Sequence, residues 1–269
     1  MEVREYRKQY EQQLAAQART DGSSTPPAVD IPALLATLRN EQASPSERLA
    51  ALQELLAVRF LAARFAPYNA EFLAALRAVA RPASDPSLRE AVLEVLALDK
   101  DPEAQALLRR GLADQKAALV PPAKALQFLA YDPHSQAAEL ARDVFQRTTD
   151  TGTKEEALRV LASDPKSADL FAALLKDKSQ PRSIRALSAT GLNFVNPQSF
   201  MAAAHTIASD DKDFDDIRAT VIGALAHAAD PADVRKNEGL VRSVQELGQR
   251  TASPNVRSAV GRLIEKLQE

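Results

Sequence analysis

An anchor residue followed seven positions later by an aliphatic side chain recurs seven times along this chain of 269 residues. Successive anchors lie 31 to 41 residues apart, which leaves room for two helices of about three turns each and the turns that join them. The anchors are Arg48, Arg89, Pro122, Lys154, Arg185, Arg218 and Arg257, and the aliphatic partners are Leu55, Leu96, Leu129, Leu161, Leu192, Leu225 and Ile264. Because repeats of this length pack mainly on their neighbours, the pattern predicts a stack of helix pairs.

The residues four positions after the anchors form a second column of the repeat. They are Leu52, Leu93, Leu126, Leu158, Ala189, Ile222 and Gly261. Residues at plus four and plus seven lie on one face of a helix. We therefore expect the two columns to form the inward stripe of the first helix of each unit.

The stretch Ser84 to Asp114 shows one unit most clearly. Asp85-Pro86 and Asp101-Pro102 mark the starts of two helices, since aspartate caps a helix N-terminus and proline suits the first turn. Apolar side chains then recur at helical spacing, at Val92, Leu93 and Leu96 in the first helix and at Leu107, Leu108 and Leu112 in the second. The unit is a pair of short amphipathic helices.

The composition agrees with helices throughout. The chain is 45% hydrophobic and has only 8 glycines, which favours helix over turn-rich or strand-rich folds. Aromatic residues make up 5% and tryptophan is absent, so the core must be built from Leu, Ala and Val in thin layers. We expect an all-α protein.

Charge and cysteine content restrict the function classes. The 34 Lys and Arg against 36 Asp and Glu give a net charge of -2, which argues against a protein that holds nucleic acid over its whole surface. The absence of cysteine excludes disulfides and thiolate chemistry. The sequence has no apolar run long enough to span a membrane, and residues 1–19 lack the apolar middle of a signal peptide. A cytoplasmic location is the expectation.

The chain divides into three parts by composition. Residues 1–19 are dense in charge and predict a helix with a thin apolar stripe of Tyr6, Tyr10 and Leu14, and residues 20–30 contain Gly, Ser and adjacent prolines typical of a linker. Residues 31–269 carry the repeats, which start on a half unit at 31–39. The N-terminal helix is either dispensable for folding or supplies the missing first helix as a cap. The last predicted helix, 254–267, has no partner and resembles a terminal cap.

The segments DPSLREAVLEVL, QPRSIRALSATGL and SPNVRSAVGRLI resemble HEAT-like repeats, particularly the short bacterial form shared with the phycobilin lyases. The likeness covers Ile31 to Leu267, although Pro122 and Lys154 replace the anchor arginine. It implies a right-handed α-α superhelix, a HEAT-like solenoid of about seven helix pairs. Families with this pattern are mostly protein-binding scaffolds, with minorities that handle chromophores or bind DNA, including alkylpurine glycosylases. Fold does not choose among these functions.

The anchor arginines have two interpretations. They could form an anion-binding ladder, but their fixed place in each unit favours hydrogen bonds to helix-end carbonyls or neighbouring aspartates.

A better functional candidate lies on the second helices. There Arg109, Arg142, His205 and Arg242 are expected at equivalent outward positions, on the surface that is concave in HEAT-like solenoids. Such a basic row would suit another protein or an acidic peptide, or phosphates. The alternative is an ordinary solvated face, because Glu139, Asp143 and Glu246 are interleaved.

The segment 60–72 concentrates four aromatic residues, Phe60, Phe65, Tyr68 and Phe72. Either an extended helix buries them against the N-terminal segment, or some are exposed for a partner.

The sequence DDKDFDD at 210–216 invites a calcium interpretation. It lacks the glycine at the sixth position of such a loop and a bidentate Glu at the twelfth, so a loop that caps the following helix is favoured. The sequence contains no recognisable catalytic motif, and no cofactor is expected.

The sequence therefore predicts a non-catalytic protein-protein interaction scaffold. The alternative is a HEAT-like nucleic-acid binder or DNA glycosylase-type enzyme, which the net charge and the absence of Trp disfavour. A chromophore-lyase helper is a third possibility without a supporting residue.

Overall fold

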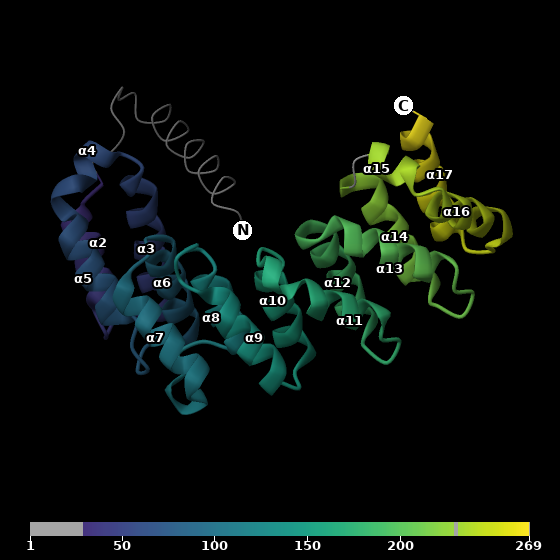
Figure 1. Ribbon diagram of the computed structural model, residues 1–269. Coiled ribbons are helices and arrows are strands. Elements are labelled where there is room, and N and C mark those ends of the chain that lie inside the picture. Colours follow the sequence, from purple (N-terminus) through teal and green to yellow (C-terminus); the bar gives the residue numbers. More distant parts are fainter. Residues whose placement is uncertain (1–28, 229–230, 269) are drawn as a thin grey trace, which may run out of the picture. The chain divides into compact units, whose positions relative to one another are not determined.

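The computed structural model describes residues 29–228 and 231–268, and the regular elements in these ranges are all helices (Figure 1). The predicted all-α class is confirmed. The helix predicted at 1–19 and most of the linker predicted at 20–30 lie outside the described residues. Within the described ranges, no helix is both long enough and apolar enough to cross a membrane.

The chain forms two compact units, Met1–Val120 and Pro121–Glu269. In the first unit, the half repeat is α2 (Ile31–Arg39). Two helix pairs follow, formed by α3 (Pro45–Arg59) with α5 (Asn69–Val79) and by α6 (Pro86–Leu98) with α7 (Pro102–Ala113). The first pair is joined by α4 (Ala62–Phe65) and the 3-10 turn η1 (Ala66–Tyr68), and a second such turn, η2 (Gln115–Ala117), follows α7.

The second unit continues the pairs. First helices are α8 (Pro122–Leu129), α10 (Thr151–Leu161), α12 (Arg182–Val195), α14 (Asp215–Ala228) and α17 (Pro254–Gln268). Second helices are α9 (Ala137–Arg147), α11 (Ala168–Lys176), α13 (Pro197–Ala208) and α16 (Glu238–Arg250). A 3-10 turn, η3 (Pro165–Ser167), precedes α11, and the short helix α15 (Pro231–Lys236) precedes α16.

Two layers of helices run through the second unit. First helices pack in succession, α8 on α10, α10 on α12, α12 on α14 and α14 on α17, while α11 packs on α13 and α13 on α16 (Figure 1). This is the stacking of helix pairs that the repeat predicts, since each pair buries its apolar face on the next.

Helix starts follow the Asp-Pro and Asn-Pro pairs of the sequence. The side chains of Asp85, Asp101 and Asn196 each accept a backbone N–H from the first turn of the helix they cap, and proline occupies the following position. Such caps satisfy donors that would otherwise lack a partner. Proline therefore marks the boundaries of the repeat.

The predicted inward columns are correct in six of the seven units. Leu55, Leu96, Leu129, Leu161, Leu192 and Leu225 are buried, as are the plus-four residues from Leu52 to Ile222. The prediction fails in α17, where Gly261 is exposed and Ile264 is only half-buried. There Val256, Val260 and Leu263 are buried instead. The helix α17 packs on α14, α15 and α16, and its buried positions fall one residue earlier than the two columns predict.

The helix α3 presents a different outer face from later first helices. The position directly before the anchor is buried in five later helices, as Leu88, Thr153, Ile184, Ile217 and Val256. In α3 this position is Glu47, which is exposed and completes a capping box with Ser44. Glu54, seven residues further on, is exposed as well. A polar outer face of this kind is typical of a terminal repeat.

Candidate functional site

The anchor arginines hold the pairs together. Arg48 Nε donates to the carbonyl oxygen of Leu38 at 2.9 Å, and Arg185 Nε donates to that of Leu175 at 2.8 Å. Both carbonyls lie in the last turn of the preceding second helix, where backbone acceptors lack a helical partner. The structural interpretation of these arginines is confirmed for both residues.

Arg185 also carries a buried ion pair. Its Nη1 and Nη2 donate to the two carboxylate oxygens of Asp213 at 2.6 and 2.7 Å, and both side chains are almost fully buried. Burial alone raises the pKa of Asp213, but the hydrogen bonds and charge of Arg185 outweigh it, so that the pKa lies below its usual range. The pair joins α12 to the loop before α14.

The other three anchor arginines also bind nearby acceptors, but their partners differ. Arg89 donates to the carbonyl of Leu119 at 2.7 Å and to those of Pro82 and Ser84. Arg218 pairs with Asp215, and Arg257 donates to the carbonyl of Thr251 at 2.9 Å. These three arginines thus make hydrogen bonds or ion pairs with residues close to their own first helices.

The acidic loop 210–216 is neutralised by basic side chains from several helices. Lys178 pairs with Asp210, Arg250 with Asp211 at 3.1 Å, and Arg182 with Asp216 at 3.3 Å. The hydrogen bond from Lys178 lowers the pKa of Asp210. The described residues hold no group of three or more His, Cys, Asp or Glu arranged to bind a metal ion. Capping was the favoured prediction, and α14 does begin at Asp215.

The basic row of the second helices does not form one uniform set. Arg142 on α9 pairs with Asp164 and donates to Ser167 Oγ at 3.2 Å, so it cross-links neighbouring pairs. Arg109 is half-buried on α7 in the first unit. Whether these residues bind a partner stays a prediction.

His205 and Arg242 do share one surface. A Cβ atom at Gly239 would lie 3.3 Å from Cε1 of His205, which places the imidazole directly against α16. Gly239 and Arg242 are three residues apart and therefore neighbours on the same helix face. Arg242 is exposed, and His205 is half-buried. Arg242 follows the buried Leu240 by two positions, whereas Arg142 follows the buried Ala141 by one, which explains their different exposure.

Two turns of the second unit differ in charge. Asp164 begins one turn and pairs with Arg142, which precedes it by 22 residues. Asn196 begins the corresponding turn of the next repeat, and Ala173, which like Arg142 lies twelve residues before its anchor, stands at the place of the arginine. Asn196 keeps the capping function, since its Oδ1 accepts from the Ser199 N–H at 3.0 Å. In the repeat that contains Asn196, both members of the ion pair are therefore replaced by neutral residues.

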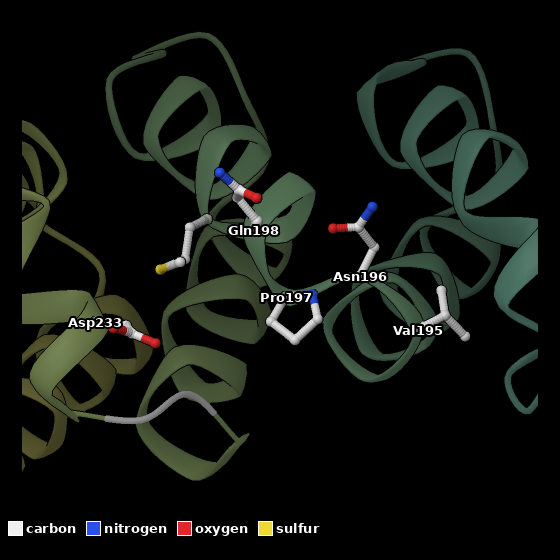
Figure 2. A pocket seen from close by; sticks show the side chains of 6 residues that line it. Val195, Asn196, Pro197, Gln198 and Asp233 are labelled. Carbon is white, nitrogen blue, oxygen red and sulfur yellow. The ribbon is translucent and has the colours of Figure 1, made fainter.

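A groove of about 570 Å³ lies at this neutral turn and is lined by Val195, Asn196, Pro197, Gln198, Met201 and Asp233 (Figure 2). Figure 2 shows Asp233, from α15, and Val195, from the end of α12, at opposite sides of the turn. Asp233 is itself paired with Lys236 at 2.9 Å. The groove therefore combines apolar side chains with two neutral amides.

Phe194 directly precedes this groove and is 75% exposed, the largest exposed fraction among the exposed large hydrophobic side chains of the described residues. Phe194 and Leu98 occupy the same repeat position, nine residues after their anchors, and Leu98 is 53% exposed. Large apolar side chains that are exposed to this degree are typical of binding surfaces. Phe194 was not predicted from the sequence, although its place outside the two inward columns was a usable signal.

The aromatic segment 60–72 is divided between core and surface. Phe65 and Phe72 are buried and pack edge to face with ring centroids 5.4 Å apart. Phe60 is 60% exposed, because α3 ends at Arg59 and no extended helix forms. The extended helix of the first alternative is therefore wrong, and a partner for the exposed Phe60 stays a prediction.

Comparisons with known proteins show a distant likeness in fold. No protein-family model matches the chain, and no curated protein sequence matches it. The structure of human deoxyhypusine hydroxylase in complex with glycerol is 13% identical, with 88% of this chain and 96% of that chain covered and a TM-score of 0.36. The crystal structure of an engineered protein is 16% identical, with 94% and 67% covered and a TM-score of 0.37. At these TM-scores neither likeness bears on function.

Proposed function

We propose that this chain is a non-catalytic protein-binding scaffold of the HEAT-like repeat type, in the short form that its sequence resembles. The observation that carries the proposal is the 75% exposed ring of Phe194, which directly precedes the groove residue Val195 in the sequence. The turn at Asp164 is held by its ion pair with Arg142, whereas the turn at Asn196 offers apolar side chains and neutral amides.

The binding surface extends from the groove along α13. Met201 lines the groove, and His205 follows it by one helical turn on the same face. Through Gly239 this face continues to Arg242 on α16. The surface formed by Phe194, Met201, His205 and Arg242 therefore has an apolar end and a basic end.

Such a surface suits a protein segment that carries an apolar anchor and an acidic residue. The anchor would occupy the groove and supply most of the binding energy, because desolvated apolar contacts dominate interfaces. The acidic residue would face Arg242, where an exposed charge contributes more to association rate and specificity than to affinity.

The test is capture of partner proteins by the immobilised full chain, compared between Phe194→Ser and Leu98→Ser. Both changes remove an exposed apolar side chain at the same repeat position, so Leu98→Ser is a matched control. We expect Phe194→Ser to lower the affinity for the captured partner by about tenfold or more, and Leu98→Ser to leave it unchanged.

A second variant examines the basic end. Arg242→Glu should weaken capture of the same partner, and more strongly at low salt, where exposed charges are least screened. Equal capture by the unchanged chain and by both Phe194→Ser and Arg242→Glu would refute the proposed surface.

A further inference from the structure

A second groove, of about 540 Å³, lies in the first unit where the described chain begins. It is lined by Val29 to Pro32 on one side and by Arg64, Pro67 and Tyr68 on the other. Arg64 Nη2 donates to the carbonyl oxygen of Val29 at 3.1 Å. The groove is therefore formed in part by the residues that directly follow the N-terminal segment.

Two exposed apolar side chains lie close to this groove in the sequence. Phe60 and Leu61 are 60% and 56% exposed, and they directly precede α4, which carries the groove residue Arg64. Phe60, Leu61, Pro67 and Tyr68 together form what we call the corner patch. Two adjacent large side chains with more than half of their surface in water are costly to leave uncovered.

The N-terminal segment contains a stripe that fits this patch. Tyr6, Tyr10 and Leu14 recur every four residues in a stretch whose sequence predicts a helix. Residues 20–28 separate this stretch from Val29, and nine residues in extended form reach roughly 30 Å. The stripe can thus reach the corner patch of its own chain without strain.

The outer face of α3 is a poorer docking place for the same stripe. Glu47 and Glu54 are exposed there, at positions that are apolar in most later repeats. Docking apolar rings over two carboxylates would remove charge from water without compensation. Docking on the corner patch, in contrast, does not require that these carboxylates be buried.

We propose that residues 2–19 dock on the corner patch in cis, with Tyr6, Tyr10 and Leu14 covering Phe60 and Leu61. This role differs from that of a missing first repeat helix and does not rest on the proposed binding surface of the second unit. The docked segment would shield the patch from other partners until it is displaced.

The absence of tryptophan makes a direct test possible. In the full chain, Phe60→Trp places a single indole in the corner patch, and Ala106→Trp places one at an exposed site on α7. We expect the indole at position 60 to emit at shorter wavelength than the indole at position 106, and to be quenched severalfold less by acrylamide.

Three further changes, Tyr6→Ser, Tyr10→Ser and Leu14→Ser, remove the stripe from either indole variant. They should raise quenching of the indole at position 60 to the level seen at position 106, and leave quenching at position 106 unchanged. Equal quenching of the two indoles before the serine changes would overturn the proposal. So would quenching at position 60 that falls with rising protein concentration, since this would show docking between two copies.

A disulfide test is independent of fluorescence, because the chain has no cysteine of its own. Gln9→Cys with Ala63→Cys should form a cross-link within one chain, whereas Gln9→Cys with Ala106→Cys should not. Ala63 and Ala106 are both exposed in the first unit. Equal cross-linking of the two pairs would contradict docking at the corner.

Discussion

The turns that begin at Asp164 and Asn196 occupy the same place in neighbouring repeats of the second unit, yet they have opposite character. At Asp164 a carboxylate caps the turn and pairs with Arg142 of the preceding second helix. At Asn196 an amide caps α13, and Ala173 stands at the repeat position of the arginine. The comparison shows that a repeat can keep its architecture while one turn lacks the ion pair and is followed by a groove of mixed apolar and polar lining, with Phe194 exposed.

The largest predicted effect concerns the buried core of the two repeats that contain these turns. Leu161 is the last residue of α10, Leu192 lies in the last turn of α12, and both are fully buried. Changing either one to Ala should cost about 2 to 5 kcal/mol of the free energy of unfolding, since it removes buried methyl groups and leaves a cavity. Urea denaturation of both variants measures this. A near-neutral effect at one position would show that the two repeats are not equivalent.

A smaller effect separates the turns. Asp164→Asn keeps the shape of the side chain but removes the charge that Arg142 faces, and this should cost about 1 to 2 kcal/mol. The reciprocal change, Asn196→Asp, introduces a carboxylate at a helix start where Ala173 stands at the repeat position of the arginine, and we expect a change below about 0.5 kcal/mol. Equal costs in urea denaturation would mean that the ion pair does not distinguish the turns.

The pH dependence sharpens the same contrast. Burial raises the pKa of Asp164, but hydrogen bonds from Ser167 and the Lys166 N–H together with Arg142 outweigh it, and the pKa lies below its usual range. The unfolded chain therefore takes up the proton first, so this contribution is present above about pH 4 and is lost as the pH falls further. The stability difference between the unchanged chain and Asp164→Asn should shrink in acid. A constant difference across this range would contradict the assignment.

The smallest effect is expected at the surface. Phe194→Ser should change the free energy of unfolding by less than about 0.5 kcal/mol, because the ring is mostly exposed. A loss comparable to that of Leu192→Ala in urea denaturation would show that the ring is part of the core instead.

The sequence predicts the packing of the repeat better than its surface. Apolar residues at plus four and plus seven identify the core, because helical periodicity and burial are coupled, and among the seven units the pattern fails in α17, where the buried positions fall one residue earlier. Ion pairs between side chains of neighbouring repeats are harder to predict from the sequence. The outward place of Arg142 was predicted, but its bond to Asp164 depends on how neighbouring helices are aligned, which single-helix periodicity does not contain.

The candidate site was predicted only in part. His205 and Arg242 were identified on the second helices, and the structure brings them together through Gly239. The groove was not predicted, because it is formed by the end of α12, the start of α13 and Asp233 of α15. The end of α3 before Phe60 was not predicted either, because no glycine or proline marks it in the sequence.

Site-specific photo-crosslinking tests the central claim most directly. Gln198 follows Asn196-Pro197, and Lys166 follows Asp164-Pro165, so a photoreactive residue at either position probes the same place in two repeats, and both side chains are exposed. The account predicts cross-linking of the full chain to the captured partner from position 198 and little or none from position 166. Equal cross-linking from both positions, or cross-linking only from position 166, would contradict it.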